Sequence, residues 1–258
     1  MTLLKRLQAY KVQESSPQCP VAGKLTRVVG LTLEAIGCRA AVGSLCKIET
    51  LDGYLEAEVV GFASDKLYLM PSEQLKGVVP GAKVTPIGEE HGVPVGMELL
   101  GRVIDGVGTP LDGLGDIITA NSARFVSRRL NPLARKPISA PMDVGVRAIN
   151  ALLTVGEGQR MGLFAGSGVG KSVLLGMMTR GTTADVVVVG LIGERGREVK
   201  EFIEDILGEE GRARSVVVAA PADASPLMRL KGCETALAIA EYFRDQGLNV
   251  LLLMDSLT

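Results

Sequence analysis

One short glycine-rich stretch holds the residue types that bind phosphate groups. Residues 165–172 read Ala-Gly-Ser-Gly-Val-Gly-Lys-Ser, with helix-forming residues directly after them. Glycines let the backbone turn tightly enough to aim several N–H groups at phosphate oxygens, and the start of a helix adds the positive end of its dipole. Lys171 is then placed for the β- and γ-phosphates and Ser172 for Mg²⁺. The stretch predicts a site for a nucleoside triphosphate.

This loop departs from the strict form of the phosphate-binding motif at one position. Ala165 stands where a glycine is usual, and alanine fits there if its φ angle is negative. We expect a strand at 159–164 to lead into the loop and a helix to follow it. The residues predicted to bind nucleotide are Gly166, Ser167, Gly168, Val169, Gly170, Lys171, Ser172 and Val173.

Asp255 stands where a metal-binding carboxylate is expected. It follows the apolar run 251–254 and so emerges at the carboxyl end of a predicted strand, the edge where open α/β sheets bind ligands. We expect it to hold Mg²⁺ through a water molecule, opposite Ser172. The alternative is an Asp that only caps the following turn. The candidate metal ligands are Ser172, Asp255 and Glu198.

Glu194 follows the apolar segment 186–192 and belongs to the sequence Gly-Glu-Arg-Gly-Arg-Glu at 193–198. It therefore projects from the same sheet edge and is a candidate to accept a hydrogen bond from an attacking water. Glu198 would lie one helical turn below it, and Arg195 is a candidate to stabilise charge during catalysis. The alternative makes both acids favourable first-turn residues of the following helix.

Composition narrows the class of protein and its partners. The chain has 258 residues, of which 47% are hydrophobic, 3% are aromatic and 32 are glycine, as expected for a glycine-rich α/β protein with an ample core. A net charge of −1 and so few aromatic residues argue against a nucleic-acid partner. The four cysteines form no Cys-x-x-Cys pair, which is typical of reduced thiols.

The chain shows no targeting or membrane-spanning signal. No apolar run approaches the roughly 20 residues that cross a bilayer. The first residues, Met-Thr-Leu-Leu-Lys-Arg-Leu-Gln-Ala-Tyr-Lys, have no apolar core and no cleavage site. We therefore expect a cytoplasmic protein.

Two hydrophobic periodicities divide the chain. Residues 24–88 alternate apolar and polar residues between turn signals such as Asp52-Gly53, which predicts a small antiparallel β-barrel. After a glycine- and proline-rich connector, strands alternate with helices, which predicts a largely parallel, helix-covered sheet. The strands are expected near 160–165, 186–192, 215–220 and 249–254, and the helices at about 171–181, 197–207 and 227–246.

Longer stretches resemble the rotary ATPase family that includes the catalytic F1 subunit. The resemblance is carried by Arg102–Gly106, Pro110–Gly113, Gly145–Asn150, Ala165–Ser172, Gly193–Val199 and Leu251–Asp255. A narrower likeness, over Gly158–Ser172, Gly190–Val199 and Met254–Thr258, is to the ATPases of bacterial type III export, specifically the flagellar one. The resemblance spans about residues 22–258.

The resemblance implies an N-terminal β-barrel domain at 22–90 that packs hexamers and a partial, RecA-like α/β P-loop core at 91–258. It also implies ATP hydrolysis with Mg²⁺, coupled to unloading and unfolding export substrates. By position, Glu194 then matches the catalytic glutamate, Lys171 the P-loop lysine, and Ser172 and Asp255 the Mg²⁺ partners. Further core strands, an arginine finger, adenine-packing aromatics and a helical domain would follow Thr258.

Partners and location also follow from the resemblance. The full-length protein would be a homo-hexamer that meets an export gate, chaperones and export substrates at the cytoplasmic face of the inner membrane. The segment 1–21 would dock a regulatory, stator-like protein and touch lipid. Its Leu3, Leu4 and Leu7, with Lys5, Arg6 and Lys11, make a short amphipathic stretch compatible with that role, and a frayed terminus is the alternative.

Other functions of the same fold remain as alternatives. They are a virulence-type secretion ATPase, a catalytic subunit of an F1-like ATP synthase, and a non-catalytic nucleotide-binding paralogue. The presence of Lys171, Ser172, Glu194 and Asp255 argues against the silent paralogue. A hexameric RNA translocase would need an aromatic and basic RNA-binding domain, and residues 24–88 hold few aromatics.

Overall fold

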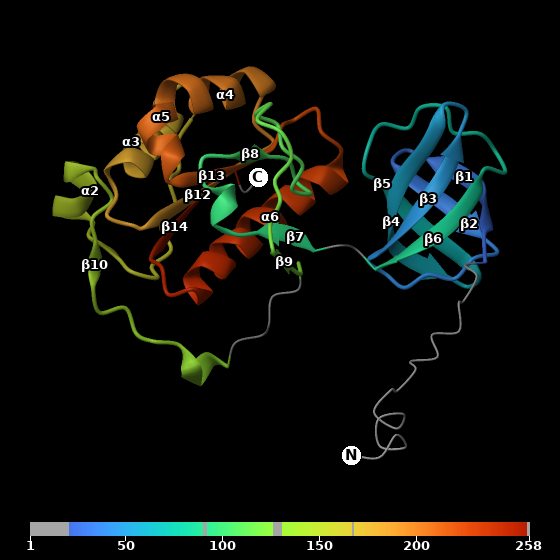
Figure 1. The fold of residues 1–258 in the computed structure, drawn as a ribbon, viewed down its shortest axis with the longest axis horizontal. Helices are drawn as coiled ribbons and strands as arrows, with labels where there is room; N and C mark the ends of the chain where they lie inside the picture. The colour runs from blue at the N-terminus through green and yellow to red at the C-terminus, as the bar shows by residue number, and fades with distance from the viewer. Residues whose placement is uncertain (1–20, 90–91, 126–130, 167, 257–258) are drawn as a thin grey trace, which may run out of the picture. The chain divides into compact units, whose positions relative to one another are not determined.

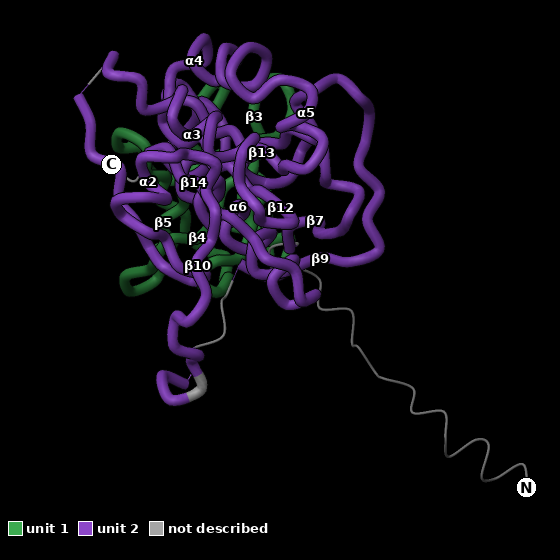
Figure 2. The backbone as a smooth tube through the Cα atoms, turned by 90° about the vertical axis from the view of Figure 1, so that its left-hand side faces the viewer, with its two compact units in different colours: residues 1–71, 75–89 green, residues 72–74, 90–258 purple. Residues whose placement is uncertain are grey.

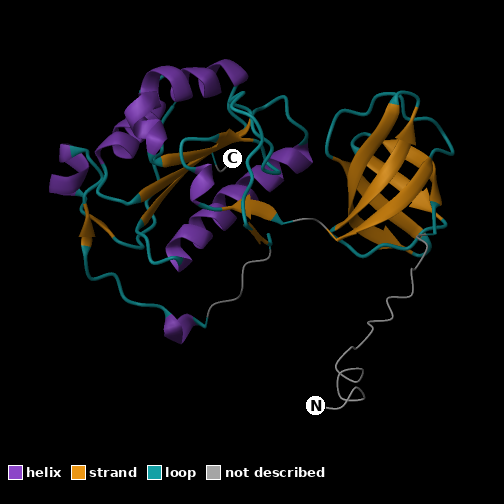
Figure 3. Ribbon diagram, in the orientation of Figure 1, coloured by secondary structure: helices purple, strands orange, loops and turns teal. Residues whose placement is uncertain are grey.

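The computed structural model describes residues 21–89, 92–125, 131–166 and 168–256 (Figure 1). The chain divides into two compact units, residues 1–71 with 75–89 and residues 72–74 with 90–258 (Figure 2). The described residues of the first unit form strands and loops, whereas the second unit combines helices with strands (Figure 3). The predicted partner-docking segment, residues 1–21, falls outside the described residues except for its last residue.

The first unit is a closed barrel of six antiparallel strands, which confirms the predicted barrel. The alternating pattern places every second side chain inside, so Leu33, Ile48 and Leu69 are fully buried. Pairing of β1 with β6 closes the barrel and leaves no edge strand. The strands are β1 (Gly23–Val29), β2 (Thr32–Ile36), β3 (Ser44–Thr50), β4 (Gly53–Ala63), β5 (Lys66–Pro71) and β6 (Lys83–Glu89).

The second unit is built on a four-stranded sheet with the order β14-β12-β13-β8. Every neighbouring pair in this sheet is parallel, as the sequence predicts. All residues of the two central strands are buried, because helices cover both faces and the Val, Ile and Leu runs suit that position. The strands are β8 (Val103–Ile104), β12 (Val186–Ile192), β13 (Ser215–Ala220) and β14 (Val250–Asp255).

The helix α6 (Pro226–Asp245) covers one face of this sheet. Ser225 caps its start by accepting a hydrogen bond from the Met228 amide, and Pro226 occupies the first turn. Ile239 and Phe243 of α6 are fully buried against residues of β12 and β13.

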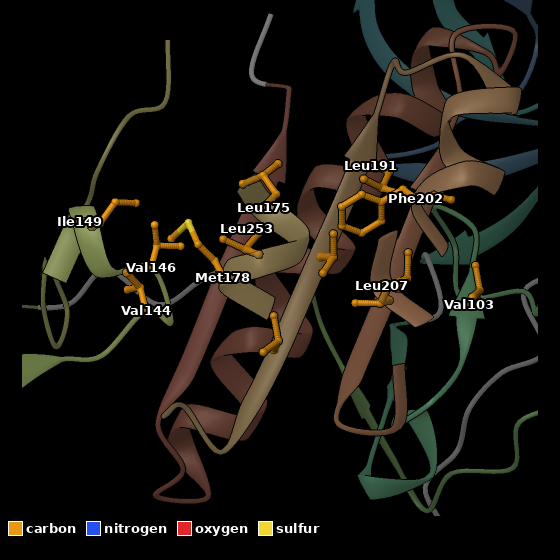
Figure 4. Close-up of a cluster of buried hydrophobic side chains, with 14 of the residues drawn as sticks. Val103, Val144, Val146, Ile149, Leu175, Met178, Leu191, Phe202, Leu207 and Leu253 are labelled. Carbon is orange, nitrogen blue, oxygen red and sulfur yellow. The ribbon is translucent and has the colours of Figure 1, made fainter. Parts of the chain in front are cut away.

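The opposite face is covered by α3 (Lys171–Gly181) and by a helical stretch that begins after β12, while α2 (Arg147–Leu152) lies at the outer end of the unit (Figure 1). Leu175 and Met178 of α3 share a buried cluster with Phe202 and with Leu253 of β14 (Figure 4). The stretch after β12 contains α4 (Gly196–Glu201), a π-helical segment (Phe202–Leu207) and α5 (Gly208–Ala213).

The predicted strand at 159–164 is wrong, because the residues leading into the glycine-rich loop form no strand. Met161 and Leu163 are half-buried, while Gly162 and Phe164 are exposed, so the alternation that suggested a strand is real. A strand also needs a neighbour for its backbone hydrogen bonds. Within the described residues, β14 pairs only with β12, and no strand pairs with 159–164.

Short elements complete the second unit. The paired strands β7 (Val93–Val95) with β9 (Asn121–Ala123) and β10 (Pro141–Met142) with β11 (Val155–Gly156) are antiparallel. Short 3₁₀ helices lie at Met97–Leu99 and Pro132–Ala134. Among the described residues, no helix has the length and apolar character needed to span a membrane.

Candidate nucleotide-binding site

The glycine-rich loop forms an open backbone cradle at the start of α3. Gly168 and Gly170 adopt φ angles of 76° and 92°, which only glycine takes without strain. A Cβ atom added at Gly166, Gly168 or Gly170 would meet no atom within 4 Å, so the cradle faces open space. Its Ser167 lies outside the described residues. Loop and helix start therefore fit a phosphate group.

Three charged side chains meet beside this cradle. The Lys171 ammonium group contacts the Asp255 carboxylate and lies 4.0 Å from Oε1 of Glu194. Asp255 is the last residue of β14 and is 3% exposed, while Glu194 lies two residues after the end of β12. Because β12 and β14 are parallel neighbours, their carboxyl ends deliver both acids to one edge of the sheet.

Backbone hydrogen bonds fix the segment that carries Glu194. The amide of Gly193 donates to the carbonyl of Ala220 over 2.8 Å, and the Ala222 amide donates to the Glu194 carbonyl over 2.9 Å. The amide of Ser256 donates to the carbonyl of Ile192 over 3.2 Å. Backbone hydrogen bonds thus join the carboxyl ends of β12, β13 and β14. The sheet therefore fixes the positions of Glu194 and Asp255.

The charges in the site shift one another's titration. The hydrogen bond with Asp255 raises the pKa of Lys171, so the ammonium form is favoured. Burial raises the pKa of Glu194, and the nearby Asp255 charge adds to the rise while Lys171 opposes it. A carboxylate with a raised pKa beside a phosphate cradle is suited to accept a proton.

The buried Asp255 carboxylate is engaged by Lys171 in the absence of nucleotide. Its Oδ1 atom contacts the Lys171 ammonium group, so this ion pair would have to open before Oδ1 could meet a cation. The described residues contain no group of three His, Cys, Asp or Glu side chains placed to hold a metal ion. A hard cation such as Mg²⁺ commonly takes one or two protein oxygens together with phosphate and water ligands, so Asp255 and Ser172 fit it.

Arg195 and Glu198 form a separate pair at the rim. Their side chains are joined by a hydrogen bond of 2.7 Å, and the Arg195 side chain is 66% exposed. Hydrogen bonding from Arg195 is the main cause that lowers the pKa of Glu198, and Glu198 also interacts with Glu194. The structure therefore connects Glu198 to the site through Glu194, and Arg195 faces solvent.

Two contacts around the site, one between α3 and the π-helical segment and one between Lys171 and Asp255, were not predicted from the sequence. A Cβ added at Gly176, in the middle of α3, would approach Cγ2 of Ile206 to 2.1 Å, so α3 packs closely on the π-helical segment after the Glu194 loop. A glycine inside a helix is the sequence signal of such a close approach. The ion pair between Lys171 and Asp255 had no such signal, because it depends on the order of strands in the sheet.

A protein-family comparison matches residues 145–258 to the ATP synthase alpha/beta family, nucleotide-binding domain. Over these residues the second unit is similar to that domain, and together with the parallel sheet this gives it the class of a P-loop nucleotide-binding fold. The structure of the assembled ATPase EscN from the enteropathogenic E. coli type III secretion system superposes with a TM-score of 0.83 at 42% identity, covering 91% of this chain and 56% of that chain.

Within that class, the chain resembles flagellar and type III secretion ATPases. It is 60% identical over 98% of its length to the flagellum-specific ATP synthase of Pseudomonas aeruginosa, and it covers 57% of that relative. The corresponding protein of Salmonella typhimurium is 59% identical over 92% of this chain, which covers 54% of that protein. The type 3 secretion system ATPase of Xanthomonas euvesicatoria is 51% identical over 92% of this chain, which covers 54% of it. The chain thus spans a little over half the length of these relatives.

Proposed function

We propose that this chain binds ATP with Mg²⁺ and that, within a longer protein, the site hydrolyses ATP to drive protein export through a flagellar type III apparatus. The observation that carries the proposal is the convergence of Lys171, Glu194 and Asp255 beside the open cradle of 166–172. Identities of 60% and 59% to the flagellum-specific proteins of Pseudomonas aeruginosa and Salmonella typhimurium, against 51% to the Xanthomonas secretion ATPase, favour the flagellar assignment.

Each residue at the site has a defined task in this proposal. The backbone of 166–173 cradles the phosphates, and Lys171 leaves Asp255 to contact the β- and γ-phosphates. Ser172, and Asp255 through a water molecule, would hold Mg²⁺, which would supply positive charge beside the phosphates. Glu194 orients the attacking water and accepts its proton.

The two rim residues have narrower roles. Glu198 interacts with Glu194 and supports its orientation, and it is a candidate outer metal ligand through water. Arg195 would have to leave Glu198 before it could stabilise charge on the transferring phosphate. An arginine supplied by a neighbouring subunit is the alternative source of that charge.

The proposed assembly extends beyond the described residues. We propose a hexamer in which residues 22–90 form the packing domain and residues 91–258 contribute the nucleotide core. EscN has been described both as an assembled ATPase and in complex with its central stalk EscO, which supports a ring with a stalk partner here. Residues 1–21 would bind a regulatory protein at the cytoplasmic face of the inner membrane, where chaperones, export substrates and an export gate are met.

Hydrolysis is tested by comparing the 258-residue chain with a version extended to the length of its relatives. We expect phosphate release by the extended protein to rise cooperatively with concentration as rings form, and the 258-residue chain to show a flat baseline. Brisk turnover by a monomeric 258-residue chain would contradict the ring mechanism and would point to Arg195 or Arg197 as its own charge-stabilising residue.

A genetic test separates the export pathways. Replacing the chromosomal gene with a Glu194→Gln copy should abolish swimming and leave flagellar filament protein inside the cell. Normal flagella, with loss of a virulence-type secreted protein instead, would favour the virulence-type alternative. Normal export with impaired ATP synthesis would favour an ATP synthase subunit.

A further inference from the structure

The end of α3 farthest from the phosphate cradle is held by Arg214, which stands just before β13. Its Nη2 atom donates to the carbonyl oxygens of Thr179 and Thr182, each over 2.8 Å, and to that of Arg180 over 3.3 Å. These carbonyls belong to the last turn of the helix and the residue after it, where intrahelical donors are lacking. The positive charge also suits the negative end of the helix dipole. Arg214 therefore fixes the carboxyl end of α3.

A loop preceding α2 holds the same end from another direction. The carbonyl of Asp143 accepts hydrogen bonds from the Thr182 hydroxyl and the Thr183 amide, both over 3.0 Å. Gly145, with a φ angle of 74°, packs directly on Gly181 at the end of α3. A Cβ added at Gly145 would come within 2.3 Å of the Gly181 Cα atom, so only glycine allows this backbone contact.

The loop is itself held in shape by Asp143 and Asn150. The Asp143 carboxylate accepts hydrogen bonds from the Gly145 amide over 2.7 Å and the Asn150 side chain over 2.6 Å. Asn150 accepts a further hydrogen bond from the Val144 amide over 3.1 Å. Val144, which follows Asp143, lies in the same buried cluster as Met178 of α3 (Figure 4). The segment Gly145–Asn150 therefore supports the carboxyl end of α3, a role that was not predicted from its sequence.

The opposite end of α3 is held by the ion pair of Lys171 with Asp255, which a bound nucleotide would separate. Its N-cap is Gly170, which supplies no side-chain hydrogen bond, and the loop before it is exposed. A helix is a stiff rod that rises about 1.5 Å per residue, so its axial position is set wherever it is anchored. The anchor at residues 179–184 consequently determines where Lys171 and Ser172 stand. An error of about 1 Å in such a group has large effects on binding and rate.

We propose that Arg214, Gly145 and Asn150 are positioning residues that set the axial position of α3 and thereby the affinity of the cradle for a nucleoside triphosphate. This inference rests on the proposed nucleotide binding. The three residues touch no phosphate in this role. They act through the helix that carries Lys171 and Ser172.

The first test compares Arg214→Gln with a matched control, Arg212→Gln. Arg212 donates to the Gly101 carbonyl over 2.7 Å and pairs with Asp112, so its loss also removes arginine contacts, but these contacts do not involve α3. We expect Arg214→Gln to weaken binding of a fluorescent Mg-ATP analogue about tenfold, and Arg212→Gln to leave it unchanged at a similar loss of melting temperature. Arg214→Lys keeps the positive charge but lacks the planar guanidinium group, so its affinity for the analogue should lie between those of the unmodified chain and Arg214→Gln.

Hydrogen exchange provides a readout that needs no nucleotide. In the nucleotide-free chain, Arg214→Gln should speed exchange at the amides of residues 173–176, including the Leu174 amide that donates to the Gly170 carbonyl. Asn150→Ala, a milder change at a partly buried residue, should produce the same effects if Arg214→Gln folds poorly. If the unmodified chain binds no nucleotide, the proposed function fails, while the exchange experiment still tests the anchor.

Three results would overturn the positioning role. One is unchanged exchange at 173–176 in both Arg214→Gln and Asn150→Ala. Another is unchanged nucleotide affinity in these variants when the unmodified chain binds. The third is an equal loss of affinity in Arg212→Gln, since that would show a general effect of lowered stability.

Discussion

The Lys171 ammonium group pairs with the Asp255 carboxylate across the space between α3 and β14. Asp255 is 3% exposed and Lys171 is 30% exposed, so the pair is held largely away from water. Without nucleotide, the lysine proposed to bind the phosphates therefore forms an ion pair with the carboxylate proposed to bind Mg²⁺. A bound nucleotide would have to separate them, and both partners would then acquire new ligands.

The first prediction concerns stability without nucleotide. Lys171→Met should lower the free energy of unfolding by about 1–3 kcal/mol, because it leaves the buried Asp255 carboxylate without its cation. Adding Asp255→Asn should recover part of that loss, since no buried charge then remains unpaired. Urea denaturation of the single and double variants measures both effects. Additive losses in the double variant would show that the two side chains do not interact.

The second prediction separates binding from chemistry. In a version extended to the length of the relatives, Glu194→Gln should keep nucleotide affinity and lose most single-turnover hydrolysis. The amide keeps the size of the side chain but cannot accept a proton from water. Rapid-quench measurement of one turnover provides the rate. Hydrolysis at the unmodified rate would leave Glu194 as an acid that merely begins a helix.

The third prediction concerns pH and the pair formed by Arg102 and Asp112. Two hydrogen bonds of 2.8 and 3.0 Å from Arg102 lower the pKa of Asp112, whose side chain is 2% exposed. The ionised carboxylate therefore stabilises the fold above the unfolded-state pKa of about 4, and this contribution declines as the pH falls through the lower pKa of the folded state. The melting temperatures of the unmodified chain and Asp112→Asn should differ at pH 7 and converge towards pH 2. A difference in melting temperature that stays constant from pH 7 to pH 2 would show that the ionised Asp112 carboxylate does not stabilise the fold.

The fourth prediction concerns the close contact between α3 and the π-helical segment. Gly176→Ala should destabilise the chain by about 1–3 kcal/mol, because the new methyl group meets Ile206. In the presence of Ile206→Ala the same change should cost much less, since the obstructing branch has gone. A double-mutant cycle by thermal unfolding measures the coupling. A cost of Gly176→Ala that is the same with either residue at 206 would rule out the contact.

Much of the architecture could be predicted from local patterns, and the exceptions have physical causes. The alternation in 24–88 and the apolar runs of β12 to β14 identify a barrel and a parallel sheet, because the hydrophobic period and the length of an apolar run are local properties of the sequence. The strand expected at 159–164 has the right alternation but lacks a partner, and pairing is a non-local property. The π-helical turn at 202–207 has an apolar pattern that an α-helix also permits.

The candidate site shows the same division. Motif spacing placed Lys171, Glu194 and Asp255 at the ends of their elements, and parallel topology brought those ends together. The ion pair of Lys171 with Asp255 and the hold of Arg214 on α3 depend on which elements become neighbours. Ser167 lies outside the described residues, and its predicted role in phosphate binding stays a prediction.

The central claim is that residues 166–173 with Lys171 bind the phosphates of Mg-ATP. The most direct measurement is a titration of the 258-residue chain and its Lys171→Ala variant with a fluorescent, slowly hydrolysed ATP analogue in the presence of Mg²⁺. We predict saturable binding to the unmodified chain and loss of tight binding in the variant, because the change removes the mobile cation that reaches the β- and γ-phosphates. Equal affinity in the two proteins, or no binding to the unmodified chain, would contradict the account.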